Sequence, residues 1–279
     1  MEPLKRDLLE GLGCEGSIEI AEGVYWVGAA DEKINLHSNS YLIADHGEAV
    51  LIDGGSRNDF GAVMLKIMHA GISPKNIIRL IYQHYDPDMC GNLPHMEALI
   101  DSDELAVLSH YENNLFLDQY SAETKKHCIE DQDFCFEFSS GRRLEFIHTP
   151  YSHSLGSFVT YDTKTKTLFS SDIFGCYDAE WELYSSIDES CSECEVCKTC
   201  PKTKKTCQLF AMFDFQRRIM TSTKALRYAL KQIQGLDISQ IAPQHGSILK
   251  TPTSQRIAFE RLFSLPRIGI DNVVEGEIG

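Results

Sequence analysis

The heptapeptide His84-Tyr85-Asp86-Pro87-Asp88-Met89-Cys90 decides the fold of this chain. It follows the apolar run 77–82, which predicts a strand that ends in a loop. Alternate side chains of extended backbone point to one side, so His84, Asp86 and Asp88 are expected to face the same way. Imidazole and carboxylate groups suit a hard metal ion. The heptapeptide therefore predicts a metal site at the end of a strand.

Three later segments repeat this placement of polar residues just past an apolar stretch. They are Pro150-Tyr151-Ser152-His153, Ser171-Asp172-Ile173-Phe174 and Pro243-Gln244-His245-Gly246. Taken singly, each has a simpler explanation, since His84 could be a turn histidine and Asp86-Pro87 an ordinary turn dipeptide. Taken together, the segments supply enough ligands for two metal ions.

Composition excludes several classes of protein. The chain has 279 residues, 43% of them hydrophobic, and a net charge of −15, which disfavours nucleic acid and anionic membranes as partners. The beginning of the chain lacks an apolar core of signal-peptide length, and no apolar run approaches a membrane span. Ten cysteines without a signal peptide argue against a disulfide scaffold. We expect a cytoplasmic protein.

The order of predicted elements is strands first, then strands alternating with helices. Early strands are expected at 17–20, 23–27, 39–44 and 49–52, and later ones at 105–108, 144–148, 157–161, 167–170 and 238–242. Helices are expected at 61–70, 92–100, 221–235 and 255–263. This order predicts an α/β (α+β) sandwich of two sheets covered by helices. We expect one domain over residues 1–265, with a Cys-rich insertion at 191–207 and a C-terminal tail at 266–279.

At these motifs the chain resembles the metallo-β-lactamase superfamily, whose αββα fold binds metals along one edge. Two further stretches carry the likeness: Val24-Tyr25-Trp26-Val27-Gly28, and Asn39 to Ile43 with Leu51-Ile52-Asp53. More narrowly, the chain resembles the diiron domain of flavodiiron proteins. It stops before their flavodoxin domain would begin, so it is most similar to the stand-alone oxygen-binding diiron proteins (ODPs) of bacterial chemotaxis. The resemblance implies a non-heme diiron cofactor with an oxo, hydroxo or peroxo bridge, and no FMN in this chain.

The resemblance also implies a ligand set. One iron would bind His84, Asp86 and His153, and the other would bind Asp88 and His245, with Asp172 as the bridge. Hydrolytic members usually have His, and zinc, where Asp86 stands.

Two positions near this set leave alternatives open. Where the family has one more His, this chain has Met89, a weak ligand that either binds loosely or leaves a position open. His148 competes with His153, which we favour because it fits the family pattern. Asp53 is expected to stabilise the turn beside the ligands. Two interpretations stay open for Tyr85, Tyr151 and Tyr177: a hydrogen bond from the phenol to a bound oxygen species, or simple packing of the ring.

The five cysteines Cys191, Cys194, Cys197, Cys200 and Cys207 have short spacings that suit thiolate metal binding. Zinc or an iron–sulfur cluster is one interpretation. The other is a loop of reduced, redox-sensitive thiols.

Three functions are consistent with the resemblance. The first is an O2-binding oxygen sensor in chemotaxis signalling, with weak or no turnover, which would act on a chemotaxis receptor or kinase complex. The second is an O2 or NO reductase fed by an external electron donor. The third, which Asp86 and Met89 disfavour, is a zinc-dependent hydrolase. The family also implies a homodimer.

Overall fold

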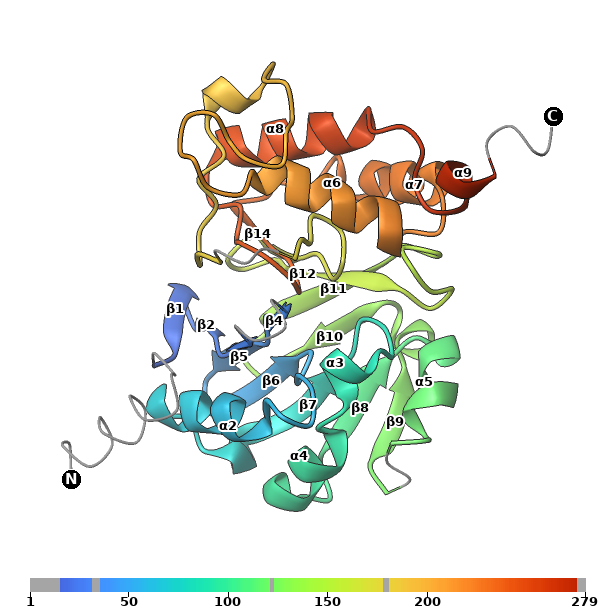
Figure 1. Cartoon of the computed structure of the whole chain (residues 1–279). Helices are drawn as coiled ribbons and strands as arrows, with labels where there is room; N and C mark the ends of the chain where they lie inside the picture. Colours follow the sequence, from blue (N-terminus) through green and yellow to red (C-terminus); the bar gives the residue numbers. More distant parts are fainter. Residues whose placement is uncertain (1–15, 32–35, 121–122, 178–180, 275–279) are drawn as a thin grey trace. The chain divides into compact units, whose positions relative to one another are not determined.

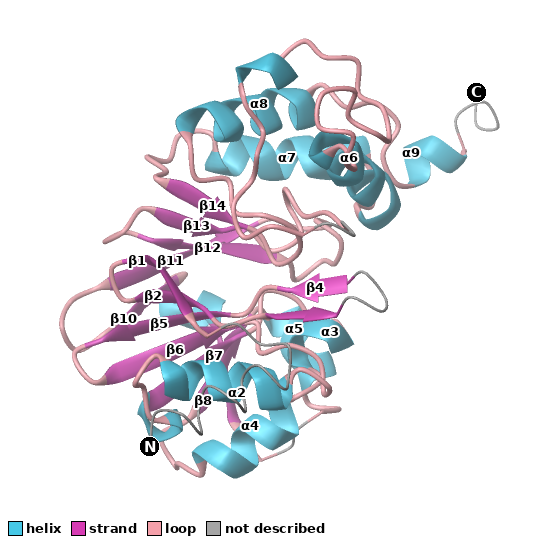
Figure 2. Cartoon of the chain, turned by 60° about the vertical axis from the view of Figure 1, so that its left-hand side comes forward, coloured by secondary structure: helices cyan, strands magenta, loops and turns pink. Residues whose placement is uncertain are grey.

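The computed structural model describes residues 16–31, 36–120, 123–177 and 181–274, which belong to two compact units. Unit 1 combines the ranges Met1–Ala30 and Ser38–Arg143, and unit 2 combines Asp31–His37 and Leu144–Gly279. Each unit has its own sheet and its own helices (Figures 1 and 2). The predicted α/β class with two sheets is confirmed.

Unit 1 contains a seven-stranded sheet in the order β1-β2-β5-β6-β7-β8-β9. Its strands are β1 Ile18–Ala21, β2 Val24–Trp26, β5 Tyr41–Asp45, β6 Glu48–Ile52, β7 Ile77–Ile81, β8 Ala106–Ser109 and β9 Lys125–Cys128. Hairpin pairing is antiparallel from β1 to β6, and pairing from β6 to β9 is parallel. The short strands β3 Ala29–Asp31, β4 Leu36–Ser38 and β10 Cys135–Glu137 lie outside this sheet.

Helices cover one face of this sheet (Figure 1). They are α2 Phe60–His69, α4 Leu93–Ile100 and α5 Tyr111–Leu117, with the single turns η1 Pro74–Asn76, α3 Pro87–Cys90 and η2 Ile129–Gln132 between strands. Ile67, Met96 and Leu117 from the three helices join Leu51 and Leu80 of the sheet in one buried apolar cluster. Burial of this apolar stripe stabilises the helices more than their intrinsic propensity does.

The sheet of unit 2 places three loops at the same edge. β11 Arg143–His148, β12 Phe158–Asp162 and β13 Thr167–Phe169 pair antiparallel in turn, and β13 pairs parallel with β14 Gln240–Ala242. Two antiparallel steps return to the starting direction, so β11, β13 and β14 all run the same way. Their carboxyl ends, and the loops that come after them, therefore share one edge.

Three longer helices cover one face of this second sheet (Figure 1). They are α6 Gln208–Ile219, α7 Thr223–Ile233 and α8 Pro252–Phe263. Ser222 caps α7 by accepting a hydrogen bond from the amide of Ala225, and Thr251 with Ser254 forms a capping box at α8. Met212, Leu230 and Leu262 of these helices contact Leu168 and Ile241 of the sheet in a buried cluster.

The segment expected as a tail from residue 266 begins as packed chain. Ile268 is fully buried, and the amide of Gly269 donates to the carbonyl of Arg217 at 3.0 Å. The short helix α9 Ile270–Val273 comes next, and the amide of Thr223 donates to Asp271 at 2.8 Å. Residues 275–279 lie outside the described residues.

Several elements did not show in the sequence pattern. These are α5, α6, β9 and β10, which the periodicity analysis left unassigned. Helix α6 carries charged and polar residues among its apolar ones, and the Cys-rich segment before it masks its start. Within the described ranges, no helix combines the length and the apolar character that crossing a bilayer requires.

Candidate metal centre

Unit 1 presents His84, Asp86 and Asp88 on the chain that leaves β7. His84 is buried, and its Nε2 atom lies 3.9 Å from Oδ2 of Asp86. Two ligand atoms on one ion, each about 2.0–2.2 Å from it, cannot be more than about 4.4 Å apart. The pair is therefore spaced to share an ion.

The expectation of extended backbone over residues 84–88 is wrong at Pro87 and Asp88, whereas Asp86 has extended dihedral angles. Asp86 is the N-cap of α3, Pro87 is its first residue, and Asp88 lies within the helical turn. Proline favours the first helical position because its φ angle suits the helix and its missing N–H is not needed there. Strand alternation therefore does not apply to Asp88. Because Asp88 lies in the first turn of α3, helical geometry sets the direction of its side chain.

The thiol of Cys90 holds the start of this turn. Its Sγ atom donates to the carbonyls of Tyr85 and Asp86, at 3.1 Å each. Burial, followed by the nearby Asp86 and Asp88 charges, raises the pKa of Cys90, so the thiol stays protonated and remains a donor. Met89, the residue before it, is fully buried, and its carbonyl accepts from the amide of Gly55 at 2.8 Å.

Asp53 supports the same loop from the end of β6. Its Oδ1 accepts from the amide of Gln83 and its Oδ2 from the side-chain amide of Gln83, both at 3.1 Å. Asp53 has a φ of 53°, a left-handed conformation that aspartate tolerates better than most residues. The carboxylate thus fixes the residue that immediately precedes His84.

Unit 2 brings His153, Asp172 and His245 together at the edge where β11, β13 and β14 end. Nε2 of His153 lies 3.7 Å from Oδ2 of Asp172, and Nε2 of His245 lies 3.7 Å from Oδ1 of the same residue. These distances are longer than a hydrogen bond but within the span of two ligands on one ion. Asp172 therefore offers a separate oxygen toward each imidazole, as a carboxylate that bridges two ions must.

The loop that carries Asp172 is fixed on both sides. The side-chain amide of Gln216, on α6, donates to the carbonyl of Asp172 at 2.7 Å. The amide of Gln244 donates to the carbonyl of Ser171 at 2.9 Å, which ties this loop to the one that carries His245. Ser171 has a φ of 50°, and His153 has a φ of 84°. Such conformations cost free energy and concentrate at functional sites.

The tautomer of His245 is set by its other ring nitrogen. Nδ1 lies 2.9 Å from the carbonyl of His37, which accepts a hydrogen bond, so Nε2 carries the lone pair that a metal needs. The ring of Tyr177 meets the His245 ring edge-on at 5.4 Å, and Phe215 lies at 5.7 Å. These contacts fix the plane of the imidazole as well as its protonation.

The remaining predicted residues differ in their surroundings. Tyr85 stacks on Phe116 at 4.2 Å, and Tyr151 is 52% exposed. His148 ends β11, and its Nε2 lies 2.9 Å from the carbonyl of Leu155, so it is engaged as a strand residue. The sequence analysis missed Gln216, the carbonyl of His37 and the thiol of Cys90, because each acts through a contact that no local pattern announces.

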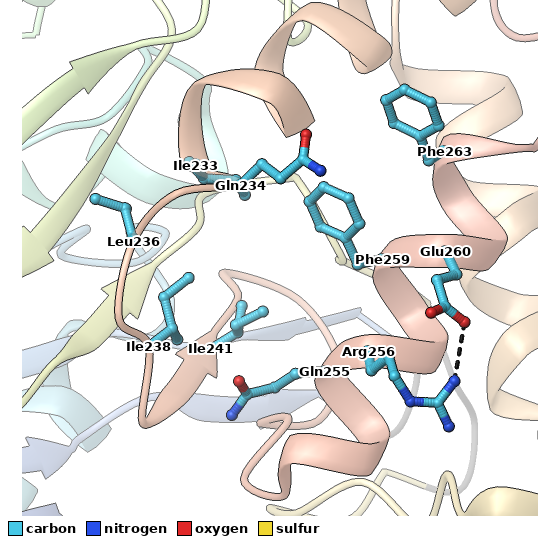
Figure 3. A pocket seen from close by; sticks show the side chains of 10 residues that line it. All are labelled: Ile233, Gln234, Leu236, Ile238, Ile241, Gln255, Arg256, Phe259, Glu260 and Phe263. Atoms are coloured by element: carbon cyan, nitrogen blue, oxygen red, sulfur yellow. Dashed lines mark hydrogen bonds and ion pairs between the residues drawn. The ribbon is translucent and has the colours of Figure 1, made fainter.

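A pocket in unit 2 is separate from these residues. It encloses about 530 Å³ between α7, β14 and α8, with Leu236, Ile238 and Phe259 along its wall and Arg256 and Glu260 at its rim (Figure 3). None of its lining residues is a candidate metal ligand.

Comparison with protein families gives one match over most of the chain. A family model described as "ODP family beta lactamase" matches residues 36–246. Among curated proteins, an uncharacterized protein of Methanocaldococcus jannaschii is 29% identical over 250 residues, which cover 84% of this chain and 57% of that protein. An anaerobic nitric oxide reductase flavorubredoxin of Aeromonas hydrophila is 25% identical over 257 residues. The matched region covers 86% of this chain and 48% of that protein. The chain thus spans about half the length of these relatives.

Solved structures with the same fold include two kinds of protein. The apo state of the chemotaxis sensor ODP from T. denticola superposes with a TM-score of 0.70 at 22% identity, over 93% of this chain and 97% of that one. A flavo di-iron protein variant from Thermotoga maritima gives a TM-score of 0.73 at 22% identity, over 89% of this chain and 61% of that one. At these identities the likeness establishes the fold.

We predict that Asp53→Ala lowers the free energy of unfolding by about 2–4 kcal/mol, because it removes two hydrogen bonds to a carboxylate and places alanine in a left-handed conformation. Asp53→Asn tolerates that conformation and keeps an acceptor for the Gln83 amide, so it should cost about 1 kcal/mol. Urea denaturation measures both. Equal losses in the two variants would show that the negative charge, rather than the bonds to Gln83, stabilises the loop.

Proposed function

Because the chain belongs to the ODP family of beta lactamases and has the metallo-β-lactamase fold predicted for it, we propose that it is a non-heme diiron protein that binds O2 and acts as an oxygen sensor. One iron would bind His84, Asp86 and His153. The other would bind Asp88 and His245, and Asp172 would bridge the two.

The observation that carries this proposal is the position of Asp172 between two imidazoles. Each of its oxygens lies 3.7 Å from the Nε2 atom of a different histidine. Two ions about 3.5–4 Å apart can be spanned by one such carboxylate. A buried carboxylate flanked by neutral imidazoles is also costly unless cations compensate its charge. The donor set therefore fits a dinuclear centre.

The chemistry of the donors favours iron over zinc. Three carboxylates and three imidazoles make a hard, oxygen-rich set, whereas the hydrolytic relatives place a histidine where this chain has Asp86. When bound, ferrous iron would supply the electrons that O2 binding requires. The chain's own residues would hold the ligands, and His245 would keep its proton on Nδ1 through the His37 carbonyl.

The sensor role rests on Met89 and on the nature of one structural relative. Met89 stands where the family pattern has a histidine, and a thioether donates weakly to iron, which should slow reductive chemistry. One structure with this fold is described as a peroxy diiron species of a chemotaxis sensor ODP, at 23% identity. By analogy, we propose a chemotaxis receptor or kinase complex as the partner of a cytoplasmic, homodimeric sensor.

Aromatic hydroxyls near the ligands are proposed as supports. Tyr177, whose ring contacts His245, is the best placed of the three tyrosines. Tyr85 is held by stacking on Phe116, and Tyr151 has an exposed ring. Their role would be to orient ligands or to donate a hydrogen bond to a bound gas.

A second candidate function is O2 or NO reduction with an external electron donor. It is favoured by the relatives that are named anaerobic nitric oxide reductase flavorubredoxin. The two functions use the same metal centre but diverge once O2 has bound, because a sensor holds the oxidised state whereas a reductase turns over.

The first experiment is anaerobic loading with Fe²⁺, followed by optical spectra after O2 is added without a donor. We expect two irons per chain and a visible absorption band that persists for many minutes. Rapid conversion to a plain diferric spectrum, with steady O2 consumption once a reductant is supplied, would favour the reductase. Selective retention of zinc with no response to O2 would refute both proposals.

We predict that Met89→His shortens the lifetime of this O2-induced band at least about tenfold, because imidazole would donate more strongly to the second iron. Met89→Leu is the matched control: it keeps the apolar volume and removes the sulfur. It should leave the lifetime within about twofold. An unchanged lifetime in Met89→His would mean that Met89 does not limit reactivity.

We predict that His84→Ala and Asp172→Asn each lose at least one iron per chain, as measured by inductively coupled plasma mass spectrometry. His148→Ala should keep both irons, because His148 is engaged with the Leu155 carbonyl. Circular dichroism verifies that all three variants fold. Full iron content in His84→Ala and Asp172→Asn would show that the ligands are assigned wrongly.

A further inference from the structure

The Cys-rich segment, residues 189–207, contains none of the proposed iron ligands, and it has a defined conformation. It begins at the single turn η3 Glu189–Cys191 and ends where Cys207 becomes the N-cap of α6. Within it, all five cysteines have free thiols and are partly buried. Its backbone contacts decide which of these thiols come together.

The first half of the segment is fastened to α8. Nη2 of Arg256 donates to both carboxylate oxygens of Glu189, at 2.9 and 2.8 Å. Arg256 also pairs with Glu260 on the same helix (Figure 3). Five residues further along α8, Nη1 of Arg261 donates to the carbonyls of Ser192 and Cys194, at 2.8 and 3.2 Å. These contacts position Cys191 and Cys194 by their backbone.

The second half turns back on itself as a small hairpin. Thr199 and Thr206 form an antiparallel bridge. The amide of Cys200 donates to the carbonyl of Lys205 at 2.8 Å, and the amide of Cys207 donates to the carbonyl of Lys198 at 3.0 Å. Cys200 and Cys207 therefore come close although six residues separate them.

The two halves meet around a small cavity. It encloses about 80 Å³, and Cys191, Cys200 and Cys207 line it together with Lys202 and Thr203. A cavity of this size holds a metal ion or two to three waters. Cys194 and Cys197 do not line the cavity, and they differ in their contacts. Sγ of Cys194 donates to the carbonyl of Cys191 at 3.5 Å, whereas Sγ of Cys197 donates to the carbonyl of Thr199 at 3.0 Å.

Packing against the core of unit 2 links Cys194 to these thiols. Cys191, Cys194 and Cys207 all pack against its buried apolar cluster, which Cys197 does not join. Cys194 thus shares this contact with two of the three cysteines that line the cavity.

We propose that Cys191, Cys194, Cys200 and Cys207 bind one divalent metal ion of the zinc or ferrous class, and that Cys197 is not a ligand. The spacing is then Cys-x2-Cys-x5-Cys-x6-Cys, in which a turn and a hairpin contribute two ligands each. Four thiolates around one ion are typical of closed, tetrahedral structural sites. Binding replaces four S–H bonds with four metal–sulfur bonds and releases four protons, and no group is oxidised or reduced.

The test is cobalt substitution of the full, reduced chain, because Co²⁺ bound by thiolates shows sulfur-to-metal charge-transfer absorption that nitrogen and oxygen ligands do not give. The proposed iron centre therefore cannot produce this signal. We expect one thiolate-bound Co²⁺ per chain in the native sequence, displaced by one equivalent of Zn²⁺. Absence of the absorption in fully reduced protein would overturn the proposal, whatever the iron centre does.

Serine variants identify the ligands. Cys191→Ser, Cys194→Ser, Cys200→Ser and Cys207→Ser should each weaken Co²⁺ binding at least about tenfold, because each removes one thiolate. Serine is a good N-cap, so Cys207→Ser preserves the start of α6, and a loss there reports on the metal. Cys197→Ser and Cys135→Ser, the latter in β10, are the matched controls and should bind normally. If Cys197→Ser weakened Co²⁺ binding as much as Cys200→Ser does, the assignment of the four ligands would be refuted.

Metal analysis of the native protein decides which ion occupies the site. The proposal is supported if the native protein contains one more zinc or iron ion per chain than the Cys200→Ser variant. Thiol titration without reductant is the complementary check: disulfides between these cysteines in freshly isolated protein, with no excess metal, would count against it.

Discussion

The buried carboxylate of Asp172 is the constraint on which the arrangement of unit 2 depends. A carboxylate removed from water needs compensating charge, and the two imidazoles that face its oxygens at 3.7 Å are too far away to donate hydrogen bonds to it. The parallel direction of β11, β13 and β14 makes this possible, because loops from three strands then leave one edge. Gln216 and Gln244 fix the backbone of the loop, so the orientation of the carboxylate is set before any ion binds.

In unit 1 the same kind of support comes from the residues just before the ligands. Asp53 holds Gln83, and Cys90 holds the carbonyls of Tyr85 and Asp86. Each contact limits the freedom of a loop residue without occupying its side chain. Ligands held in this way lose less conformational entropy when an ion binds, which raises affinity without further donors.

The sequence predicted the order of the ligand segments, the fold class and most strands, because these depend on local patterns: apolar runs followed by polar residues. It did not predict the turn at Asp86-Pro87, where proline begins a helix and overrides strand alternation. Nor did it indicate Gln216, which lies 44 positions from the residue it supports, or the backbone carbonyl of His37. Contacts of this kind arise from tertiary packing, and a glutamine in a helix has no local feature that distinguishes it.

Helix α6 connects two parts of unit 2 that are otherwise separate along the chain. Its N-cap is Cys207, which lines the small cavity. Nine residues later, the side-chain amide of Gln216 donates a hydrogen bond to the carbonyl of Asp172. At about 1.5 Å per residue, this span is a rigid rod of roughly 13 Å. A rod transmits displacement along its axis with little loss, so a contraction of the thiols around an ion would pull on the carboxylate's own backbone. Linkage then works in both directions: whatever tightens one end of the rod must alter the affinity of the other end by the same free energy.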